Sequence, residues 1–196
     1  MRESERIGAV ILAAGAGTRL GGVAKALLLT PSKRSFLASI VETARVAGLG
    51  HAVIVLGPPH GDEVVAHARE LGLLVVVNEH PERGMGSSIA LGFAAISETH
   101  CDAAWLWPVD HPNVRVATLH TLISALDTHD AARPIVATRG GHPPLIARSI
   151  WPQLAVSGDV PGGARMILGE ADMIDVEVDD EGCVRDIDTV ADLEAL

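Results

Sequence analysis

The sequence predicts a single-domain α/β protein built on a mostly parallel, doubly wound sheet. Three short apolar runs, each long enough for a buried strand, lie at residues 7–12, 52–56 and 73–77. Helical spacing of apolar residues separates them, at 35–48 and 61–71. Apolar strands that alternate with helices are typical of parallel strands covered on both faces. The order of these elements therefore favours a sheet with helices on both sides.

Composition narrows the class of protein. The 196 residues, 48% of them hydrophobic, suffice for one domain with a sizeable core. The formal net charge of −10 argues against a general nucleic-acid binder, which needs a basic face. No apolar run is long enough for a membrane span, and the first residues lack a signal-peptide core. The two distant cysteines, Cys101 and Cys183, fit a reducing compartment, so we expect a cytoplasmic protein with no nucleic-acid or membrane partner.

The loop after the first strand carries the strongest chemical signal. Residues 13–25 read AAGAGTRLGGVAK. Glycines let the backbone adopt left-handed dihedrals and leave space for a ligand, and successive N–H groups can then converge on an anion. Arg19 and Lys25 would neutralise that anion. The stretch predicts a cradle for a nucleoside triphosphate, although a simple glycine-rich turn between strand and helix is the alternative.

Two commoner phosphate-binding loops do not match this stretch. A P-loop requires GxxxxGK followed by Ser or Thr, whereas Lys25 follows Ala24 and precedes Ala26. A dinucleotide fingerprint requires a third glycine where Leu20 stands. It also requires an acid at the end of the next strand, which here ends as Val-Leu-Gly at 55–57.

Two further segments are expected at the same edge of the sheet. A polar loop at 78–86 leads into a helix at 87–97, whose N-terminus would present free N–H groups. The alternative is that Ser87 or Ser88 only caps that helix. A strand at 103–107 is followed by Asp110, and carboxyl ends of parallel strands share one edge. Asp110 is therefore a candidate ligand for Mg²⁺, which prefers carboxylates together with phosphates.

The remaining chain is richer in short elements, Gly and Pro, and predicts a small substrate-side insertion. We divide the single domain, 1–196, into a nucleotide-binding part at about 7–112 and an acceptor-binding and dimer-side part at about 113–196. The expected elements are a helix at 114–126, a strand at 135–138, a helical turn at 150–154, a helix opening at 158–165, a strand at 173–178, and a strand end at 186–189 that leads into a final helix.

Seven segments, in order, resemble the molybdenum-cofactor nucleotidyltransferases, and more closely the cytidylyltransferase branch than the guanylyltransferase branch. They are LAAGAGTRLGG at 12–22, Lys25, NEHPERGMGSSIALG at 78–92, VDHP at 109–112, GHPPLI at 141–146, GDVPGGAR at 158–165 and DIDTVADL at 186–193. The resemblance implies a Rossmann-like nucleotidyltransferase sheet. It implies attack by the terminal phosphate of molybdopterin, or of its molybdenum form, on the α-phosphorus of CTP, with release of pyrophosphate.

The resemblance also implies roles for individual residues. Arg19, Lys25 and Asp110 would be catalytic, and Asp110 and Asp188 would hold Mg²⁺, with Asp186 as the competing ligand. The nucleotide-binding residues would be Leu12, Ala13, Ala14, Gly15, Gly17, Thr18, Arg19, Lys25, Gly84, Ser87 and Ser88. The acceptor-binding residues would be Gly141, His142, Pro143, Gly158, Asp159 and Arg165.

The choice of CTP rests chiefly on Ala14, because the guanine branch tends to carry glycine there and a purine needs the extra space. Three departures from the family pattern are visible: His111 stands at a normally apolar position, and the GDVPGGAR and DIDTVADL segments differ from the usual forms. Two of them affect the acceptor side. Transfer to a sugar or polyol phosphate, and a non-catalytic carrier of nucleotide or molybdenum cofactor, therefore remain alternatives. A client molybdoenzyme is a possible partner.

Overall fold

The computed structural model describes residues 6–15, 17 and 20–195. Within them, an eight-stranded sheet runs in the order β3-β2-β1-β4-β7-β5-β6, with β8 on β5. The strands are β1 (Ile7–Ala13), β2 (Leu49–Leu56), β3 (Leu74–Val77), β4 (Ala103–Pro108), β5 (Ala131–Val136), β6 (Arg139–Gly140), β7 (Leu145–Ala147) and β8 (Met173–Glu177). The helices are α1 (Phe36–Val46), α2 (Gly61–Glu70), α3 (Met85–Ile96), α4 (Val116–Leu126), α5 (Trp151–Leu154), α6 (Gly163–Glu170) and α7 (Val190–Glu194).

The predicted fold class is confirmed. Strands β3, β2, β1 and β4 are parallel to one another, and β5 and β8 form a second parallel pair. Strand β7 is antiparallel to both β4 and β5, so the sheet is mixed at its centre. The antiparallel insertion arises because the chain between β5 and β7 returns through the short β6 hairpin rather than through a helix.

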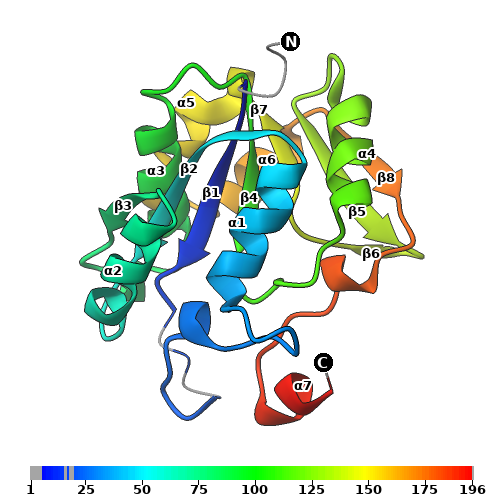
Figure 1. Cartoon of the computed structure of the whole chain (residues 1–196). Coiled ribbons are helices and arrows are strands. Elements are labelled where there is room, and N and C mark those ends of the chain that lie inside the picture. Colours follow the sequence, from blue (N-terminus) through cyan, green and yellow to red (C-terminus); the bar gives the residue numbers. More distant parts are fainter. Residues whose placement is uncertain (1–5, 16, 18–19, 196) are drawn as a thin grey trace.

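Side chains of the central strands alternate between two hydrophobic layers. Ala9 and Ile11 of β1 face the layer formed with α1, α2 and α4, whereas Val10 and Leu12 face α3, α5 and α6. Figure 1 shows these helices on the two sides of the sheet. Full burial of a Val, Leu or Ile side chain stabilises the folded state by about 1.5–3 kcal/mol. The continuous apolar runs of the sequence therefore reflect strands that are buried on both faces.

Local signals fix the first helix as predicted. The Ser35 side chain caps α1 by accepting a hydrogen bond from the Ala38 N–H at 3.0 Å. Gly48 follows the helix with a φ of 96°, a conformation that glycine adopts without strain. Loss of such an N-cap typically costs about 1 kcal/mol.

Several elements begin elsewhere than predicted: β2 at Leu49 rather than 52, α3 at Met85 rather than 87, and α6 at Gly163 rather than 158. Three further differences have a clear structural cause. Strand β5 begins at Ala131 rather than 135, because Ala131 and Ala132 pair with β7 despite the Pro134 that follows them. Helix α4 begins at Val116 rather than 114. The buried Asp180 carboxylate accepts hydrogen bonds from Arg115 N–H at 2.8 Å and from the Thr118 hydroxyl at 2.6 Å, which fixes that start from a distant part of the chain.

The third difference lies at 186–189, where the expected strand end is irregular chain. Its course is set by Ile187, which is fully buried and donates its N–H to the Asp110 carbonyl at 2.9 Å. Thr189 then caps α7 as half of a capping box with Asp192. This segment consequently lies along the loop that follows β4, at the carboxyl edge of the sheet.

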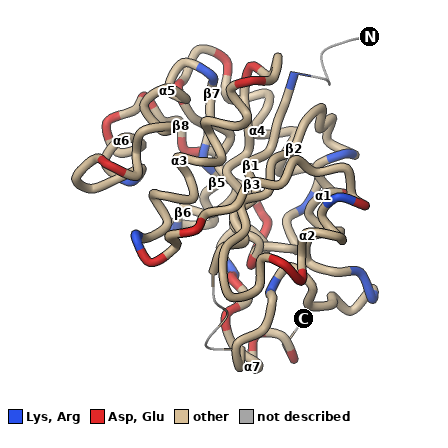
Figure 2. Tube along the Cα trace, turned by 90° about the vertical axis from the view of Figure 1, so that its left-hand side faces the viewer, with Lys and Arg blue, Asp and Glu red and all other residues tan. Residues whose placement is uncertain are grey.

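The remaining surface carries mixed charge. Acidic and basic residues are interspersed along the chain in the view of Figure 2. Cations relevant to a small ligand are therefore individual side chains rather than a continuous basic face. No helix in the described part of the chain is long and apolar enough to cross a membrane.

Candidate functional site

A cavity of about 390 Å³ opens at the carboxyl edge of the parallel strands, where ligands bind in doubly wound sheets. It is lined by the ends of β1 and β4, the glycine loop, the start of α3 and the segment before α7. The predicted residues on its wall are Leu12, Ala13, Ala14, Gly15, Gly17, Lys25, Gly84, Ser88, Asp110 and Asp188. Pro81, Met85, Pro108 and Val109 complete it and were not predicted.

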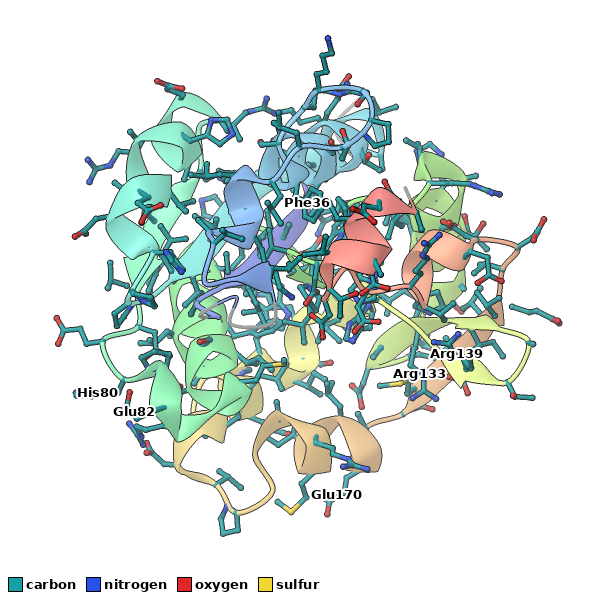
Figure 3. The ribbon with its side chains drawn as sticks, turned by 90° about the horizontal axis from the view of Figure 1, so that it is seen from below. Phe36, His80, Glu82, Arg133, Arg139 and Glu170 are labelled. Atoms are coloured by element: carbon teal, nitrogen blue, oxygen red, sulfur yellow. The ribbon has the colours of Figure 1, made fainter. Side chains whose placement is uncertain are left out.

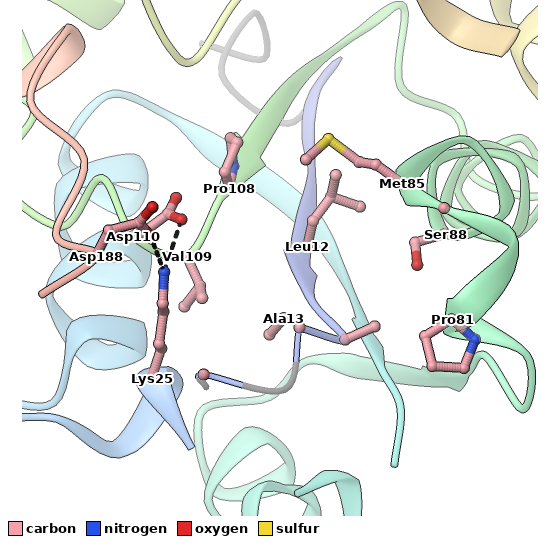
Figure 4. Close-up of a pocket in the computed structure, with 14 residues that line it drawn as sticks. Leu12, Ala13, Lys25, Pro81, Met85, Ser88, Pro108, Val109, Asp110 and Asp188 are labelled. Atoms are coloured by element: carbon pink, nitrogen blue, oxygen red, sulfur yellow. Dashed lines mark hydrogen bonds and ion pairs between the residues drawn. The ribbon is translucent and has the colours of Figure 1, made fainter. Parts of the chain in front are cut away.

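Lys25 lies between two carboxylates on this wall (Figure 4). Its Nζ donates to Oδ2 of Asp110 at 3.1 Å and forms a second, short hydrogen bond with Oδ1 of Asp188. The three side chains are only 16%, 25% and 26% exposed. Burial alone would lower the pKa of Lys25, but the hydrogen bond to Asp188 and the charge of Asp110 outweigh it, so the pKa is raised. Lys25 is therefore a fixed cation in the cavity.

The glycine loop keeps its shape through Gly17. Its φ is +58°, and a Cβ there would lie 2.2 Å from the Val23 carbonyl oxygen, so no other residue fits. The Gly17 carbonyl accepts hydrogen bonds from Leu20 and Gly22 N–H, both at 3.0 Å. The predicted residues Thr18 and Arg19 lie outside the described residues.

The opposite wall is held by an asparagine that the sequence prediction missed. Asn78 is buried immediately after β3, and its Nδ2 donates to the Ser87 hydroxyl at 2.8 Å and the Ser88 hydroxyl at 2.9 Å. Ser87 in turn donates to the Gly84 carbonyl at 2.8 Å and is not on the cavity wall, whereas Ser88 is. Ser87 thus fixes the start of α3. A polar residue directly after an apolar strand was the available signal for Asn78.

The two carboxylates form a donor set suited to a hard divalent cation. Mg²⁺ bound with phosphates takes one or two carboxylates and otherwise keeps water ligands. Asp110 and Asp188 converge on one ammonium group, so the same oxygens can face one cation. Asp186, the alternative ligand, is exposed and is not on the wall of the cavity.

A second cavity, of about 730 Å³, adjoins the first, because Met85 lies on the wall of both. Of the predicted acceptor residues, Gly141, His142 and Arg165 line it. Pro143, Gly158 and Asp159 do not. Asp159 instead pairs with Arg83 at 2.5 Å on the surface, a contact of small energetic value. Gly158 packs against α3, where an added Cβ would lie 3.2 Å from Ser87 Cα.

The cations of the second cavity differ in their availability. Arg133 forms a two-pronged pair with Asp175, at 2.8 and 3.0 Å, and is largely neutralised. Its guanidinium lies against Gly140, where an added Cβ would be 3.2 Å away. Figure 3 shows Arg133 and Arg139 on the side of the molecule opposite His80 and Glu82. Arg165 on α6 is exposed and has no ion-pair partner among the residues that the structure describes.

Comparison with known families gives this geometry a context. Residues 9–174 match the MobA-like NTP transferase domain. The chain belongs to this family. The resemblance found in the sequence is thereby confirmed at the level of the family.

One relative is matched over nearly its whole length: the chain is 37% identical to nicotine blue oxidoreductase from Paenarthrobacter nicotinovorans, over 92% of this chain and 91% of that protein. It is 30% identical to the bifunctional protein GlmU of Mycolicibacterium smegmatis over 70% of its own length, but spans only about 30% of that protein.

Solved structures agree on the fold. Rv0371c from Mycobacterium tuberculosis superposes with a TM-score of 0.81 at 29% identity, and 97% of each chain is covered. Molybdopterin-guanine dinucleotide biosynthesis protein A from Archaeoglobus fulgidus superposes with a TM-score of 0.68 at 17% identity, with 96% and 95% of the chains covered. At that identity the likeness concerns the fold alone.

Proposed function

We propose that the protein transfers CMP from CTP to the terminal phosphate of a molybdopterin-type acceptor and releases pyrophosphate. The observation that carries this proposal is the fixed Lys25 cation between Asp110 and Asp188, on a cavity that adjoins a second cavity through Met85. A triphosphate in the first cavity and a phosphate-bearing acceptor in the second would meet at that boundary.

The chemistry requires positioning and charge neutralisation more than covalent help. The acceptor phosphate oxygen forms a bond to the α-phosphorus as the bond to the β-phosphate oxygen breaks. The nucleophile is already an anion, so no general base is needed. Lys25 would stabilise the charge that develops on the α-phosphate, and Arg19 would contact the β- and γ-phosphates.

Asp110 and Asp188 would hold the divalent cation, for which we propose Mg²⁺. When bound, that ion acts as a Lewis acid and a template for phosphates. A complex of Rv0371c with manganese superposes on 97% of this chain with a TM-score of 0.71 at 24% identity. That likeness concerns the fold, so metal use by this chain rests on its own carboxylates.

The base would lie between the end of β1 and the start of α3. Ala14 is buried, and a Cβ added to the neighbouring Gly57 would lie 3.1 Å from its methyl group. Ala14 also lines the first cavity, so a glycine at position 14 would leave more space there, which supports a pyrimidine over a purine. Gly84 and Ser88 line the same cavity and would face the base and ribose.

A second candidate is an oxidoreductase activity, which the name of the full-length relative favours. Transfer to a sugar phosphate, suggested by the GlmU relatives, is a third. The carboxylate–lysine cluster favours nucleotidyl transfer, because moving a hydride between organic molecules requires no such cluster. A client molybdoenzyme and a cytoplasmic location stay predictions.

The test is pyrophosphate release from CTP, GTP, ATP and UTP with Mg²⁺, each with and without molybdopterin. Release that requires both CTP and molybdopterin supports the proposal. The Asp188→Asn variant should lose turnover, whereas Asp186→Asn, an exposed acid two residues away, serves as the matched control and should retain it. Equal activity of the two variants would contradict the assignment of Asp188.

A further inference from the structure

Two histidines join the nucleotide side of the site to the second cavity. His111 follows Asp110 directly, but its ring packs against the His142 ring, with centroids 5.0 Å apart and planes at 44°. His111 is 6% exposed, whereas His142 lies on the wall of the second cavity. The loop after β4 thus puts Asp110 on the wall of the first cavity and His111 behind a residue that lines the second.

The position of His142 is fixed by its backbone. Its N–H donates to the Cys183 carbonyl at 2.7 Å, and the preceding Gly141 N–H donates to the Pro134 carbonyl at 2.8 Å. A Cβ at Gly141 would lie 2.7 Å from the Cys183 carbonyl oxygen, so the chain there is closely packed. His111 is held in turn, because its Nδ1–H can donate to the Gly182 carbonyl at 3.2 Å. The pair therefore presents one imidazole in a defined orientation.

That imidazole has unused hydrogen-bonding capacity. Nδ1 of His142 is buried and has no partner within the described part of the chain, and no described contact engages the other ring nitrogen. Burial, and then the neighbouring His111, lower the pKa of His142 to about 4, so the ring is neutral near pH 7. A buried N–H is costly to leave unpaired, which favours the tautomer with its proton on Nε2. Only that nitrogen can serve a ligand.

The rest of the cavity wall is poor in polar side chains. Met85, Ile89, Leu106, Leu168 and Met173 supply apolar surface. Arg133 is engaged by Asp175, so among the described residues of this wall Arg165 is the available cation. A sugar would bury several hydroxyl groups here without partners, which is costly. A flat, largely apolar body with few polar atoms fits this wall better.

We propose that His142 selects the acceptor by donating a hydrogen bond from Nε2 to an uncharged acceptor atom of a heterocyclic body, while Arg165 binds an anionic group. This inference rests on the proposed function, because it takes the second cavity as the acceptor site. His111 is the positioning residue that sets the His142 ring.

The test uses pterin, glucose 1-phosphate and inorganic phosphate as separate probes on the full chain labelled with ¹⁵N-histidine. Two-bond ¹H–¹⁵N spectra report the tautomer of each ring. We expect His142 to carry its proton on Nε2 at pH 6 and to shift with pterin but not with inorganic phosphate. The exposed His120, on α4, should not shift with any probe and serves as the internal control.

Variants separate recognition from structure. His142→Phe keeps an aromatic ring but removes the donor, and should weaken pterin binding about 2- to 12-fold, the range for one net hydrogen bond. His142→Gln restores a donor and should recover part of that loss, and His111→Met should weaken binding through misplacement of the ring. His120→Gln should bind pterin as wild type. CTP binding with Mg²⁺ should be unchanged in all four variants.

The outcomes distinguish this inference from the proposed function. Absence of pterin binding, a His142 ring that pterin does not shift, or a His142→Phe variant that binds as wild type would overturn the inference. A larger shift of the His142 signals with glucose 1-phosphate than with pterin would overturn the proposal that the acceptor is a heterocycle. If His142→Phe does not fold, the wild-type spectra with pterin and the pterin affinity of His142→Gln still test whether His142 donates to the ligand. Failure of the proposed function would instead appear as no CTP binding, whatever His142 does.

Discussion

Removal of the Lys25 ammonium should convert the first cavity, which holds Asp110 and Asp188, into a site that binds a divalent metal ion without nucleotide. In the protein, Lys25 satisfies Asp110 and Asp188 at once. A divalent cation must therefore compete with an internal cation unless a phosphate draws the ammonium away. The Lys25→Met variant keeps the length of the side chain but removes the ammonium group that the two carboxylates share.

The expected loss of stability in Lys25→Met follows from how deeply the three side chains are buried. Loss of one partner costs about 3–5 kcal/mol in a buried ion pair and about 0–1 kcal/mol in an exposed pair. The Lys25 cluster is intermediate, with side chains 16–26% exposed. We therefore expect Lys25→Met to lower the free energy of unfolding by about 1–3 kcal/mol, or about 2–12 °C in Tm. A cation at about 100 times its Kd would restore about 2.7 kcal/mol.

The assay is a thermal-unfolding series with Mn²⁺ alone, CTP alone and both together. Wild type should gain little Tm from Mn²⁺ alone and much from Mn²⁺ with CTP, whereas Lys25→Met should gain most from Mn²⁺ alone. Lys33→Met, a change at an exposed lysine outside the cavity, is the control and should behave as wild type. A Lys25→Met variant that is as stable as wild type and no more responsive to Mn²⁺ would refute the reasoning.

Three further predictions follow from the same geometry. The pKa of His142 is lower in the folded protein, about 4 against an ordinary 6.5, so the folded state binds fewer protons. Wild type should therefore lose up to about 3 kcal/mol relative to His142→Phe as pH falls from 6.5 to 4, and nothing above pH 7, in urea unfolding. Ala14→Gly should shift the ratio of CTP to GTP affinity toward GTP by up to about tenfold in calorimetry, and an unchanged ratio would remove the argument for cytosine. Asn78→Ala should leave the Ser88 hydroxyl without its donor and cost about 1–3 kcal/mol in chemical unfolding; a neutral result would mean that water replaces the amide.

Local patterns were enough for the parallel half of the fold. Strands β1 and β4 and the second half of β2 are buried on both faces, so their apolar runs need no knowledge of partners. Strand β5 was misplaced because its first residues, Ala131 and Ala132, are ordinary for a helix or loop. They become strand through pairing with β7 on one side and with β8, about 40 residues further along the chain, on the other.

The residues of the site likewise divide into those that local sequence predicts and those that depend on long-range contacts. The glycine loop and Asp110 follow directly from strand ends, and those positions share one sheet edge. The preference for Asp188 over Asp186 came from the family resemblance alone, because their positions depend on the hydrogen bond from Ile187 to the loop after β4. The pairing of His111 with His142 is equally long-range. Chemistry held by one loop was predictable, whereas chemistry shared between distant segments was not.

The central claim is tested most directly by following the α-phosphate of CTP. The protein is incubated with α-³²P-labelled CTP, Mg²⁺ and molybdopterin, and the products are separated. We expect label in a molybdopterin–cytidine dinucleotide, one pyrophosphate for each dinucleotide, and neither product with Asp188→Asn. Unchanged CTP, together with reduction of nicotine blue by the same preparation when a reductant is supplied, would contradict the account.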